Sequence, residues 1–264
     1  MRRRVGTVPV EIEDVDDPRV AEFTGLRNRR RESDEFFIVE SITAIERLLG
    51  SRYPVRSMLL TPAAHARLGD ALMGLDAAIY LAAPELLHGI AGFNLHRGAL
   101  ASATRLPGPA LADVLATAHR LVVLEGSNDH ENIGAIARSA RGLGFDALVL
   151  DPTCADPFYR RSVRVSMGEL LHLPVVRCDH WPAALAQMAA AGFETWALTP
   201  SPDADDLFTL QPSERVALVA GAEGAGLSEA ALAACTRRVR IEMRHGVDSL
   251  NLGHALAIAM AVTT

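Results

Sequence analysis

The sequence contains no lysine, only three cysteines and few aromatic residues, and the first two shortages each exclude a kind of site. All 26 lysine or arginine positions carry arginine, so the glycine–lysine–serine or –threonine sequence of a phosphate-binding P-loop is absent. The cysteines, Cys154, Cys178 and Cys235, are odd in number and far apart, which favours neither a disulfide framework nor a zinc site. We expect them to be buried small hydrophobic residues. The histidines do not cluster either, so no metal site is indicated.

Long apolar runs are also missing. No run reaches the roughly 18–20 residues that a membrane-spanning helix needs. The basic residues Arg2, Arg3 and Arg4 open the chain, but acidic residues between 11 and 17 occupy the place of the apolar core of a signal peptide. We therefore expect a cytoplasmic protein. With 264 residues, 49% hydrophobic and 5% aromatic, the chain can form one large or two smaller α/β domains.

The net charge of −6 argues against broad, non-specific binding of nucleic acids. The arginines are nevertheless concentrated in two places, and guanidinium groups match the geometry of phosphates. We expect these two groups to contact nucleic-acid phosphates: Arg27, Arg29, Arg30 and Arg31, and Arg160, Arg161 and Arg164. For the first group the alternative is a solvated helix face balanced by Glu32, Asp34 and Glu35.

The first part of the chain predicts a small α/β domain. Residues 1–17 lack a regular hydrophobic pattern, which indicates a mobile arm or an edge strand. Strand and helix patterns alternate over residues 18–105, which predicts a compact α/β domain. The patterns predict strands at 36–39, 55–60 and 78–81, and helices at 20–31, 41–49, 62–68 and from 84 onward.

A break separates this region from a second α/β domain. Pro107-Gly108-Pro109 cannot continue a helix or a central strand, so we place a linker at 106–110 and a second domain at 111–264. Residues 121–124 form a continuous apolar run, typical of a strand buried on both faces of a parallel sheet. Further strands are predicted at 147–150, 173–176, 195–198, 216–220 and 239–241, and helices at 132–141, 182–191 and 249–262.

Three polar stretches lie where predicted strands end, which is where open α/β sheets keep their ligand crevices. They are the segments 131–138, 221–228 and 247–252. Together they supply a fixed cation, amides, a hydroxyl, a carboxylate and backbone exposed by glycine, but no nucleophilic cysteine. That set suits binding and positioning better than covalent catalysis. In Gly221-x-x-Gly224-x-Gly226 the glycines stand in the wrong order for a dinucleotide fingerprint, which argues against a nicotinamide-dependent oxidoreductase.

These stretches resemble the motifs of the SpoU branch of the SPOUT RNA methyltransferases, also called the TrmH family. Residues 132–138 match its N-x-G-A-I-x-R, residues 221–228 match its G-x-E-G-x-G-L-S, and Ile241-Glu242-Met243 with Ser249-Leu250-Asn251 resemble its I-P-M and S-L-N. Residues 164–168 resemble its R-x-S-x-G segment. Departures are Glu242 in place of proline, Asp248 in place of glutamate, and Gly253-His254 in place of small β-branched or hydroxyl residues.

The resemblance implies a fold and a cofactor. It implies a C-terminal trefoil-knotted SPOUT domain with a parallel sheet, an exception to the rule that chains are unknotted. Residues 26–31 and 37–40 resemble the start of the small ribosomal-protein-like domain that precedes it in many members. S-adenosyl-L-methionine is expected in the knot, beside Thr199, Gly221, Ile241, Met243 and Leu250. Members are homodimers whose active site is completed across the interface.

The resemblance also implies S-adenosylmethionine-dependent 2′-O-methylation of a ribose in RNA. Family proposals make Arg138 a general base, but a guanidinium is almost never deprotonated, so we expect it to stabilise the developing alkoxide and the adjacent phosphate. The alternative for Arg138 is a salt bridge on the helix surface. The other residues expected at the catalytic site are Asn132, Glu223, Ser249 and Asn251.

Several alternatives stay open at this stage. Asn132 and Asn251 are expected to hold the ribose and the loops. Ser249 either contacts the substrate or caps the last helix, and Glu223 either holds the loops through backbone amides or faces the RNA. The accessory domain favours ribosomal over transfer RNA. The competing function is a non-enzymatic RNA-binding relative that acts in ribosome assembly, and the intact Asn132, Arg138 and Asn251 argue against it.

Overall fold

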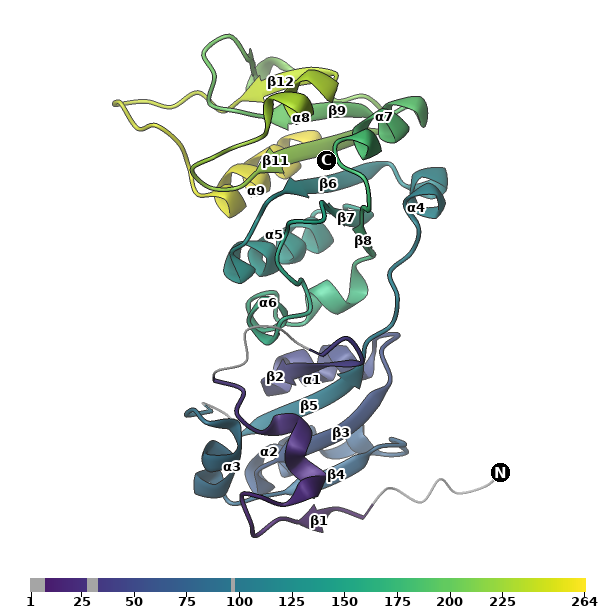
Figure 1. Cartoon of the computed structure of the whole chain (residues 1–264), viewed down its shortest axis with the longest axis vertical. Coiled ribbons are helices and arrows are strands. Elements are labelled where there is room, and N and C mark those ends of the chain that lie inside the picture. Colours follow the sequence, from purple (N-terminus) through teal and green to yellow (C-terminus); the bar gives the residue numbers. More distant parts are fainter. Residues whose placement is uncertain (1–7, 28–32, 96–97) are drawn as a thin grey trace. The chain divides into compact units, whose positions relative to one another are not determined.

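The chain folds into two compact units, as seen in a computed structural model that describes residues 8–27, 33–95 and 98–264 (Figure 1). Unit 1 comprises Met1–Leu106 together with Phe158–His172, and unit 2 comprises Pro107–Pro157 together with Leu173–Thr264. The division after Leu106 falls at the position of the linker expected from Pro107-Gly108-Pro109. Each unit has its own sheet and its own core and is described separately.

Unit 1 is built on a mixed five-stranded sheet with the strand order β1-β4-β3-β5-β2. Strand β3 lies parallel to β4 and antiparallel to β5, and β2 is antiparallel to β5. The strands are β1 (Val10–Glu11), β2 (Phe36–Glu40), β3 (Val55–Leu60), β4 (Ala78–Leu81) and β5 (Ala99–Thr104). Strand β1 pairs with β4 at the sheet edge. Residues 10–11 therefore form an edge strand and not a mobile arm.

The helices of unit 1 largely match the pattern in the sequence, with one error. The unit contains η1 (Pro18–Phe23), α1 (Ile42–Leu49), α2 (Pro62–Leu68), η2 (Gly69–Leu72) and α3 (Pro84–Ala91). The α-helix predicted at 20–31 is wrong for residues 20–27, where the 3-10 helix η1 ends before Thr24 and Gly25 has a φ of +65°. Within η1, the buried residues Val20 and Phe23 are spaced by three, the repeat of a 3-10 helix, and the buried Leu26 follows after the helix has ended. Residues 28–31 lie outside the described residues.

A segment that the sequence placed in the second domain packs in unit 1 instead. It contains α6 (Arg160–Val165) and η3 (Glu169–His172), which pack on β2 and α1. The ring of Phe158 lies 5.2 Å from that of Phe37 and 5.3 Å from that of Tyr53. Gly168 has a φ of +82°, and a Cβ there would lie 2.7 Å from the Cβ of Arg47. The glycine of the R-x-S-x-G segment therefore has a packing role inside unit 1.

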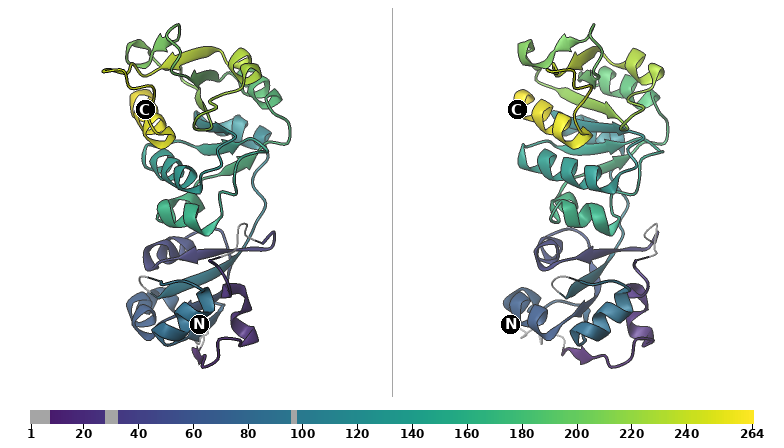
Figure 2. Two further views of the ribbon diagram at one scale, coloured as in Figure 1. Left: turned by 60° about the vertical axis from the view of Figure 1, so that its left-hand side comes forward. Right: turned by 90° about the vertical axis from the view of Figure 1, so that its left-hand side faces the viewer.

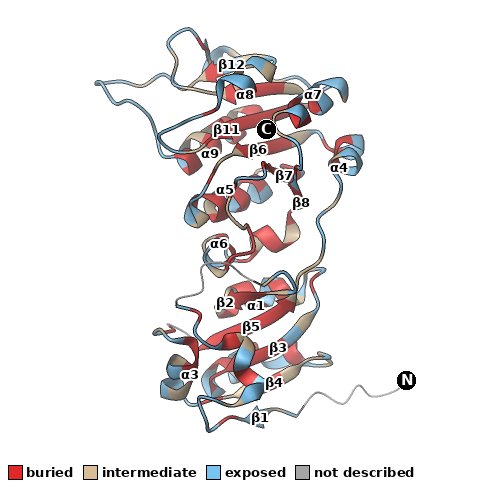
Figure 3. Cartoon of the chain, viewed as in Figure 1, coloured by how far each residue is buried: buried red, intermediate tan, exposed pale blue. Residues whose placement is uncertain are grey.

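Unit 2 confirms the predicted α/β fold with a parallel sheet. Its seven strands follow the order β10-β12-β9-β11-β6-β7-β8, and all neighbouring pairs are parallel. The central strands β6 and β11 are almost wholly buried (Figure 3). The strands are β6 (Arg120–Glu125), β7 (Ala147–Leu150), β8 (Val175–Arg177), β9 (Glu194–Leu198), β10 (Asp205–Asp206), β11 (Val216–Gly221) and β12 (Arg237–Arg240).

Helices cover both faces of this sheet. One face packs on α4 (Leu111–Thr117), α7 (Ala183–Ala190) and α8 (Glu229–Ala234) through alternate strand residues such as Leu121 and Val123. The other face packs on α5 (His130–Gly142) and α9 (Leu252–Thr263), which lie side by side (Figure 2). A short 3-10 helix, η4 (Leu207–Thr209), contacts α9. None of the described helices is both long and apolar enough to cross a membrane.

Candidate functional site

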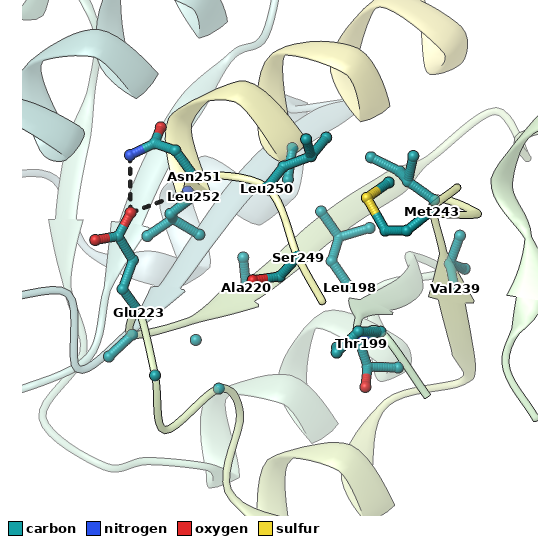
Figure 4. A pocket seen from close by; sticks show the side chains of 17 residues that line it. Leu198, Thr199, Ala220, Glu223, Val239, Met243, Ser249, Leu250, Asn251 and Leu252 are labelled. Carbon is teal, nitrogen blue, oxygen red and sulfur yellow. Dashed lines mark hydrogen bonds between the residues drawn. The ribbon is translucent and has the colours of Figure 1, made fainter. Parts of the chain in front are cut away.

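A cavity of about 390 Å³ lies at the carboxyl ends of β9, β11 and β12 (Figure 4). The segment that leads into α9 closes its remaining side. Leu198, Val239 and Leu252 give it an apolar wall, while Ala222, Glu223, Gly224 and Gly226 of the loop after β11 line another side. The five residues expected to bind the cofactor all line this one cavity: Thr199, Gly221, Ile241, Met243 and Leu250.

The loop after β11 is a tight hairpin that only glycine permits. A Cβ on Gly221 would lie 2.0 Å from the carbonyl carbon and oxygen of Gly226, so a side chain has no room there. The backbone N–H of Gly226 donates to the carbonyl of Ala222 at 2.8 Å, and Gly224 and Gly226 have φ values of +85° and +70°. The glycines of the second motif therefore shape this side of the cavity.

Hydrogen bonds join the three motifs at the rim of the cavity. The Asn251 amide donates to Glu223 Oε1 at 2.8 Å and to Asn132 Oδ1 at 2.9 Å. The backbone N–H of Leu252 donates to the same Glu223 oxygen at 3.2 Å (Figure 4). Glu223 thus contacts a backbone amide, which agrees with the expectation that it holds the loops. The network connects the first turn of α5, the hairpin after β11 and the start of α9.

The helix cap at α9 belongs to Asn251 and not to Ser249. Asn251 Oδ1 accepts from the backbone N–H of His254 at 3.2 Å, and the helix begins at Leu252. The predicted start at 249 was therefore too early, and the capping alternative for Ser249 is wrong. Ser249 is exposed and lines the cavity, and its hydroxyl has no hydrogen bond to any residue that the structure describes.

Arg138 lies on α5, less than two turns beyond Asn132. Its side chain is exposed, whereas Asn132 retains only 6% of its accessible surface. Within residues 8–27, 33–95 and 98–264, no carboxylate forms a salt bridge with Arg138, so a helix-surface ion pair does not account for it. Arg138 does not line the cavity.

The arginines expected to bind RNA lie in unit 1, and they differ in their surroundings. Arg27, Arg161 and Arg164 are exposed, and Arg29, Arg30 and Arg31 lie outside the described residues. The side chain of Arg160 is only 13% exposed, lies 3.2 Å from a Glu40 carboxylate oxygen and stacks 4.4 Å above the centroid of the Phe93 ring. Packing inside unit 1 therefore accounts for Arg160.

Sequence reasoning missed Asp151, which shapes the loops after β6 and β7. Burial by itself would raise the pKa of Asp151, but hydrogen bonds from the Thr153 hydroxyl and from the N–H groups of Gly126 and Cys154 hold it below its usual value. Burial also raises the pKa of the Cys154 thiol to about 12. Cys154 and Cys178 are buried as expected, whereas Cys235 is only partly buried. The only signal for Asp151 was an acidic residue directly after an apolar run.

Comparisons with known proteins point to one family. Residues 119–261 match the SpoU rRNA Methylase family. An uncharacterized tRNA/rRNA methyltransferase of Mycobacterium tuberculosis is 42% identical over 257 residues, which cover 94% of this chain and 89% of that protein. The 23S rRNA (guanosine(2553)-2'-O)-methyltransferase RlmP of Bacillus subtilis is 31% identical over 144 residues, 54% of this chain and 57% of RlmP.

Solved structures share the fold over nearly the whole chain. An AdoMet-bound rRNA methyltransferase from Sinorhizobium meliloti has a TM-score of 0.82 at 22% identity and covers 96% of this chain and 97% of its own. The SpoU methyltransferase AviRb from Streptomyces viridochromogenes, in complex with AdoMet, has a TM-score of 0.79 at 25% identity, with 93% and 96% covered. Because the family match spans more than half of the 264 residues, the chain belongs to the SpoU rRNA methylase family of RNA methyltransferases.

Proposed function

We propose that the protein transfers a methyl group from S-adenosylmethionine to a ribose 2′-hydroxyl of RNA. The observation that carries the proposal is a cavity lined by Glu223 and Asn251, which hydrogen bonds join to each other and to Asn132, one residue from each motif. RlmP, a 2′-O-methyltransferase by name, supports the position of transfer. The AdoMet complexes of two proteins with this fold support the methyl donor.

The cavity fits S-adenosylmethionine. Its volume of about 390 Å³ lies in the usual range of small-molecule sites, about 300–1,000 Å³. An apolar wall suits a nucleoside base, and backbone groups near Gly221 suit its polar edges. Thr199, Gly221, Ile241, Met243 and Leu250 would hold the molecule, in the knot that the family resemblance implies. When bound, it supplies a methyl group on a sulfonium that is already a good leaving group.

The residues of the three motifs would orient the reactants and stabilise charge. Methyl transfer to a hydroxyl needs an in-line approach and loss of a proton from a weak acid. We assign Arg138 to the developing alkoxide and the adjacent phosphate, because a guanidinium keeps its charge and does not act as a base. Ser249 presents a free hydroxyl to the substrate. Asn132 and Asn251 hold the loops and contact the ribose.

Ribosomal RNA is the favoured substrate, ahead of transfer RNA. Unit 1 adds a substrate-binding surface on which Arg27, Arg161 and Arg164 are exposed. Guanidinium groups bind RNA phosphates without regard to sequence, so these side chains would supply affinity and orientation. An RNA substrate of this kind also agrees with the cytoplasmic location expected from the sequence.

A homodimer is part of the proposal. Helix α9 is apolar almost all round, and Ala257, Ile258, Ala261 and Val262 are not buried within the single chain. A helix of this composition normally has partners on every side. We propose that a second copy covers this side of α9 and completes the active site. Ala261→Arg should therefore give a monomer in light scattering with size-exclusion chromatography, and an unchanged dimer would exclude this surface.

The experiment that tests the function has two stages. Calorimetry should show S-adenosylmethionine binding to the purified protein, since a protein that only binds RNA does not need a methyl donor. Mapping of 2′-O-methyl groups in total RNA from knockout and parent cells should then reveal one position methylated only in the parent. A protein that binds no S-adenosylmethionine, or a knockout with an unchanged map, would overturn the proposal.

A further inference from the structure

Glu125, the last residue of β6, lies directly under the hairpin of the second motif. Its Cα pairs in register with that of Gly221, the residue at which β11 ends and the hairpin begins. One carboxylate oxygen, Oε1, accepts from the Trp181 indole N–H at 2.6 Å and from the Ser228 hydroxyl at 2.7 Å. The other, Oε2, accepts from the backbone N–H of Ser228 at 2.8 Å. Three donors thus converge on one carboxylate.

Ser228 is the point at which the hairpin leaves the cavity. The hairpin runs from Ala222 to Leu227 and carries Glu223, which contacts Asn251 and the start of α9. Ser228 follows it and caps α8, since its Oγ accepts from the backbone N–H of Ala231 at 3.2 Å. By holding both the hydroxyl and the N–H of Ser228, Glu125 fixes the exit of the hairpin next to its entry at Gly221.

The chemistry of this contact indicates a positioning role. The residues that the structure describes offer Glu125 no salt bridge, so neutral N–H and O–H donors alone satisfy a half-buried carboxylate. Removing charge from water without a counter-ion is costly. The Glu125 carboxylate offsets this cost because it accepts hydrogen bonds from the Trp181 indole and from the N–H and hydroxyl of Ser228. An apolar residue at this position would leave these three donors without a partner.

We propose that Glu125 is a positioning residue for the methyl donor. Through Ser228 it sets the path of the hairpin that lines the cavity, and through the hairpin it sets the affinity for S-adenosylmethionine. It does not line the cavity, and it is not expected to contribute to the transfer step. This inference rests on the proposed function, because it assumes that the cavity holds S-adenosylmethionine.

Glu125→Gln is the sharpest variant, because it keeps the size of the side chain and removes one acceptor. The amide oxygen can still accept from Trp181 and the Ser228 hydroxyl, but the amide NH2 then faces the Ser228 N–H, donor against donor. Glu194→Gln is the matched control. Glu194 opens β9 at the opposite edge of the same sheet, and its carboxylate lies 3.0 Å from Arg237 and away from the cavity.

The readouts separate positioning from general destabilisation. For Glu125→Gln we expect the Kd and the KM for S-adenosylmethionine to rise about tenfold, with kcat within about threefold of wild type. Glu194→Gln should leave Kd and KM within about twofold. A purely structural defect would instead lower the calorimetric stoichiometry and kcat, through loss of folded protein, while the Kd of the remaining protein stayed the same.

If Glu125→Gln folds poorly, two variants with smaller expected changes in the Kd for S-adenosylmethionine test the same connection. Ser228→Ala removes one donor and the cap of α8 but keeps the backbone N–H contact, so a rise of about threefold in Kd is expected. Trp181→Phe removes a donor that does not belong to the hairpin, and its Kd should stay within about twofold. Equal effects of Ser228→Ala and Trp181→Phe would overturn the role of Ser228 as the connection.

Failure of the inference is distinct from failure of the proposed function. If wild-type protein binds S-adenosylmethionine and Glu125→Gln, with full stoichiometry, binds it equally well, the positioning role is wrong and the function stands. If wild-type protein does not bind S-adenosylmethionine, the proposed function fails first.

Discussion

The two edges of the unit 2 sheet are held mainly by different charged side chains, arginines at the amino edge and carboxylates around the cavity. At the amino edge, Arg120 donates to the carbonyls of His119, Glu214 and Thr263. Arg215, at the same edge, donates to the carbonyls of Leu115, Ala118 and Ala191. Asp146 is an exception at this edge, because its carboxylate accepts from the N–H groups of His119 and Arg120. At the carboxyl edge, the carboxylates of Glu125, Asp151 and Glu223 accept from N–H and O–H groups of the loops. Arg177, the last residue of β8, is the exception there, because it donates to the carbonyls of Pro152, Cys154 and Ala155.

The difference follows from the direction of the chain. Where a helix ends before a parallel strand begins, backbone carbonyls are left without partners, and arginines satisfy them. Where a strand ends and a loop or helix begins, N–H groups are exposed, and carboxylates satisfy those. Arginines at the amino edge are therefore engaged in holding the fold. At the cavity, carboxylates hold the loops, and Ser249 keeps a hydroxyl without a partner among the described residues.

Removing the charge of Arg138 on α5 should give the largest functional effect. Arg138→Ala should reduce methyl transfer at least about a hundredfold, because loss of one charged donor to a developing oxyanion costs that much or more. Binding of S-adenosylmethionine should stay within about twofold, measured by calorimetry. Arg141→Ala, an exposed arginine one turn further along the same helix, is the control and should remain active. Near-normal activity of Arg138→Ala would exclude its assigned role.

Adding one carbon at Gly221, where β11 ends and the hairpin begins, should strongly weaken cofactor binding. In Gly221→Ala the new Cβ would lie 2.0 Å from the backbone of Gly226, so the hairpin must move. We expect the Kd for S-adenosylmethionine to rise more than about a hundredfold, equivalent to about 2.7 kcal/mol. Gly142→Ala, where a Cβ meets no atom within 4 Å, is the matched control and should bind normally. Normal binding by Gly221→Ala would show that the hairpin does not shape the site.

Removing the hydrogen bonds of Arg215 at the amino edge should lower the stability of the fold without changing the binding of S-adenosylmethionine. Arg215→Met keeps an apolar contact with Phe193 but leaves three carbonyls without their donor. We expect a loss of about 2–4 kcal/mol in the free energy of unfolding, measured with urea. The folded variant should bind S-adenosylmethionine with unchanged Kd. Arg238→Met, at an exposed position of β12, should be nearly neutral, and an equal loss there would contradict the assignment.

Two substitutions of Glu223 should distinguish the contribution of its hydrogen-bond-accepting oxygen from that of its negative charge. The contacts with Asn251 and the Leu252 N–H use the same carboxylate oxygen, so an amide oxygen can replace it. Glu223→Gln should keep methyl transfer within about threefold of wild type, whereas Glu223→Ala should lose about tenfold or more. An equal loss in both variants would instead favour direct action of the charge on RNA or cofactor.

The smallest effect concerns acid stability. Because the folded-state pKa of Asp151 lies below its unfolded value of about 3.9, its ionised form stabilises the fold at neutral pH. That contribution disappears as the pH falls below 3.9 and through the folded-state pKa. Asp151→Asn should therefore cost about 1–3 kcal/mol at pH 7 in urea denaturation and visibly less near pH 3. A pH-independent difference would show that ionisation of Asp151 is irrelevant.

Hydrophobic periodicity predicted much of the fold. Apolar runs such as 121–124 and 147–150 became strands of the parallel sheet, since a strand buried on both faces cannot alternate. Errors arose where local patterns are ambiguous. Val20, Phe23 and Leu26 are buried at a three-residue spacing that suits both a 3-10 helix and an α-helix. The short helix α8 (Glu229–Ala234) was not predicted because two turns of alanine-rich sequence carry little periodic signal.

The residues of the candidate site that belong to sequence motifs could be predicted. Single residues that hold the loops through hydrogen bonds to distant parts of the chain could not. Four of the five residues expected at the cofactor came from the second and third motifs, and all five line one cavity. Glu125 and Asp151 belong to no motif pattern, and their contacts join residues far apart in the chain, such as Glu125 and Ser228. Arg160 looked like its exposed neighbour Arg164, but Glu40 and Phe93, both distant in sequence, bury it.

The sequence by itself determined the class of fold and the break after unit 1, because these depend on local periodicity and on proline and glycine. It also indicated the residues that line the cavity, through the resemblance of its short motifs to those of the family. Only the tertiary structure decided that Phe158–His172 packs in unit 1, that Asn251 and not Ser249 caps α9, and that Glu125 holds the hairpin. Those outcomes depend on contacts between segments that lie far apart in the chain or on which of two competing polar groups satisfies a given N–H, and neither leaves a repeat in the sequence.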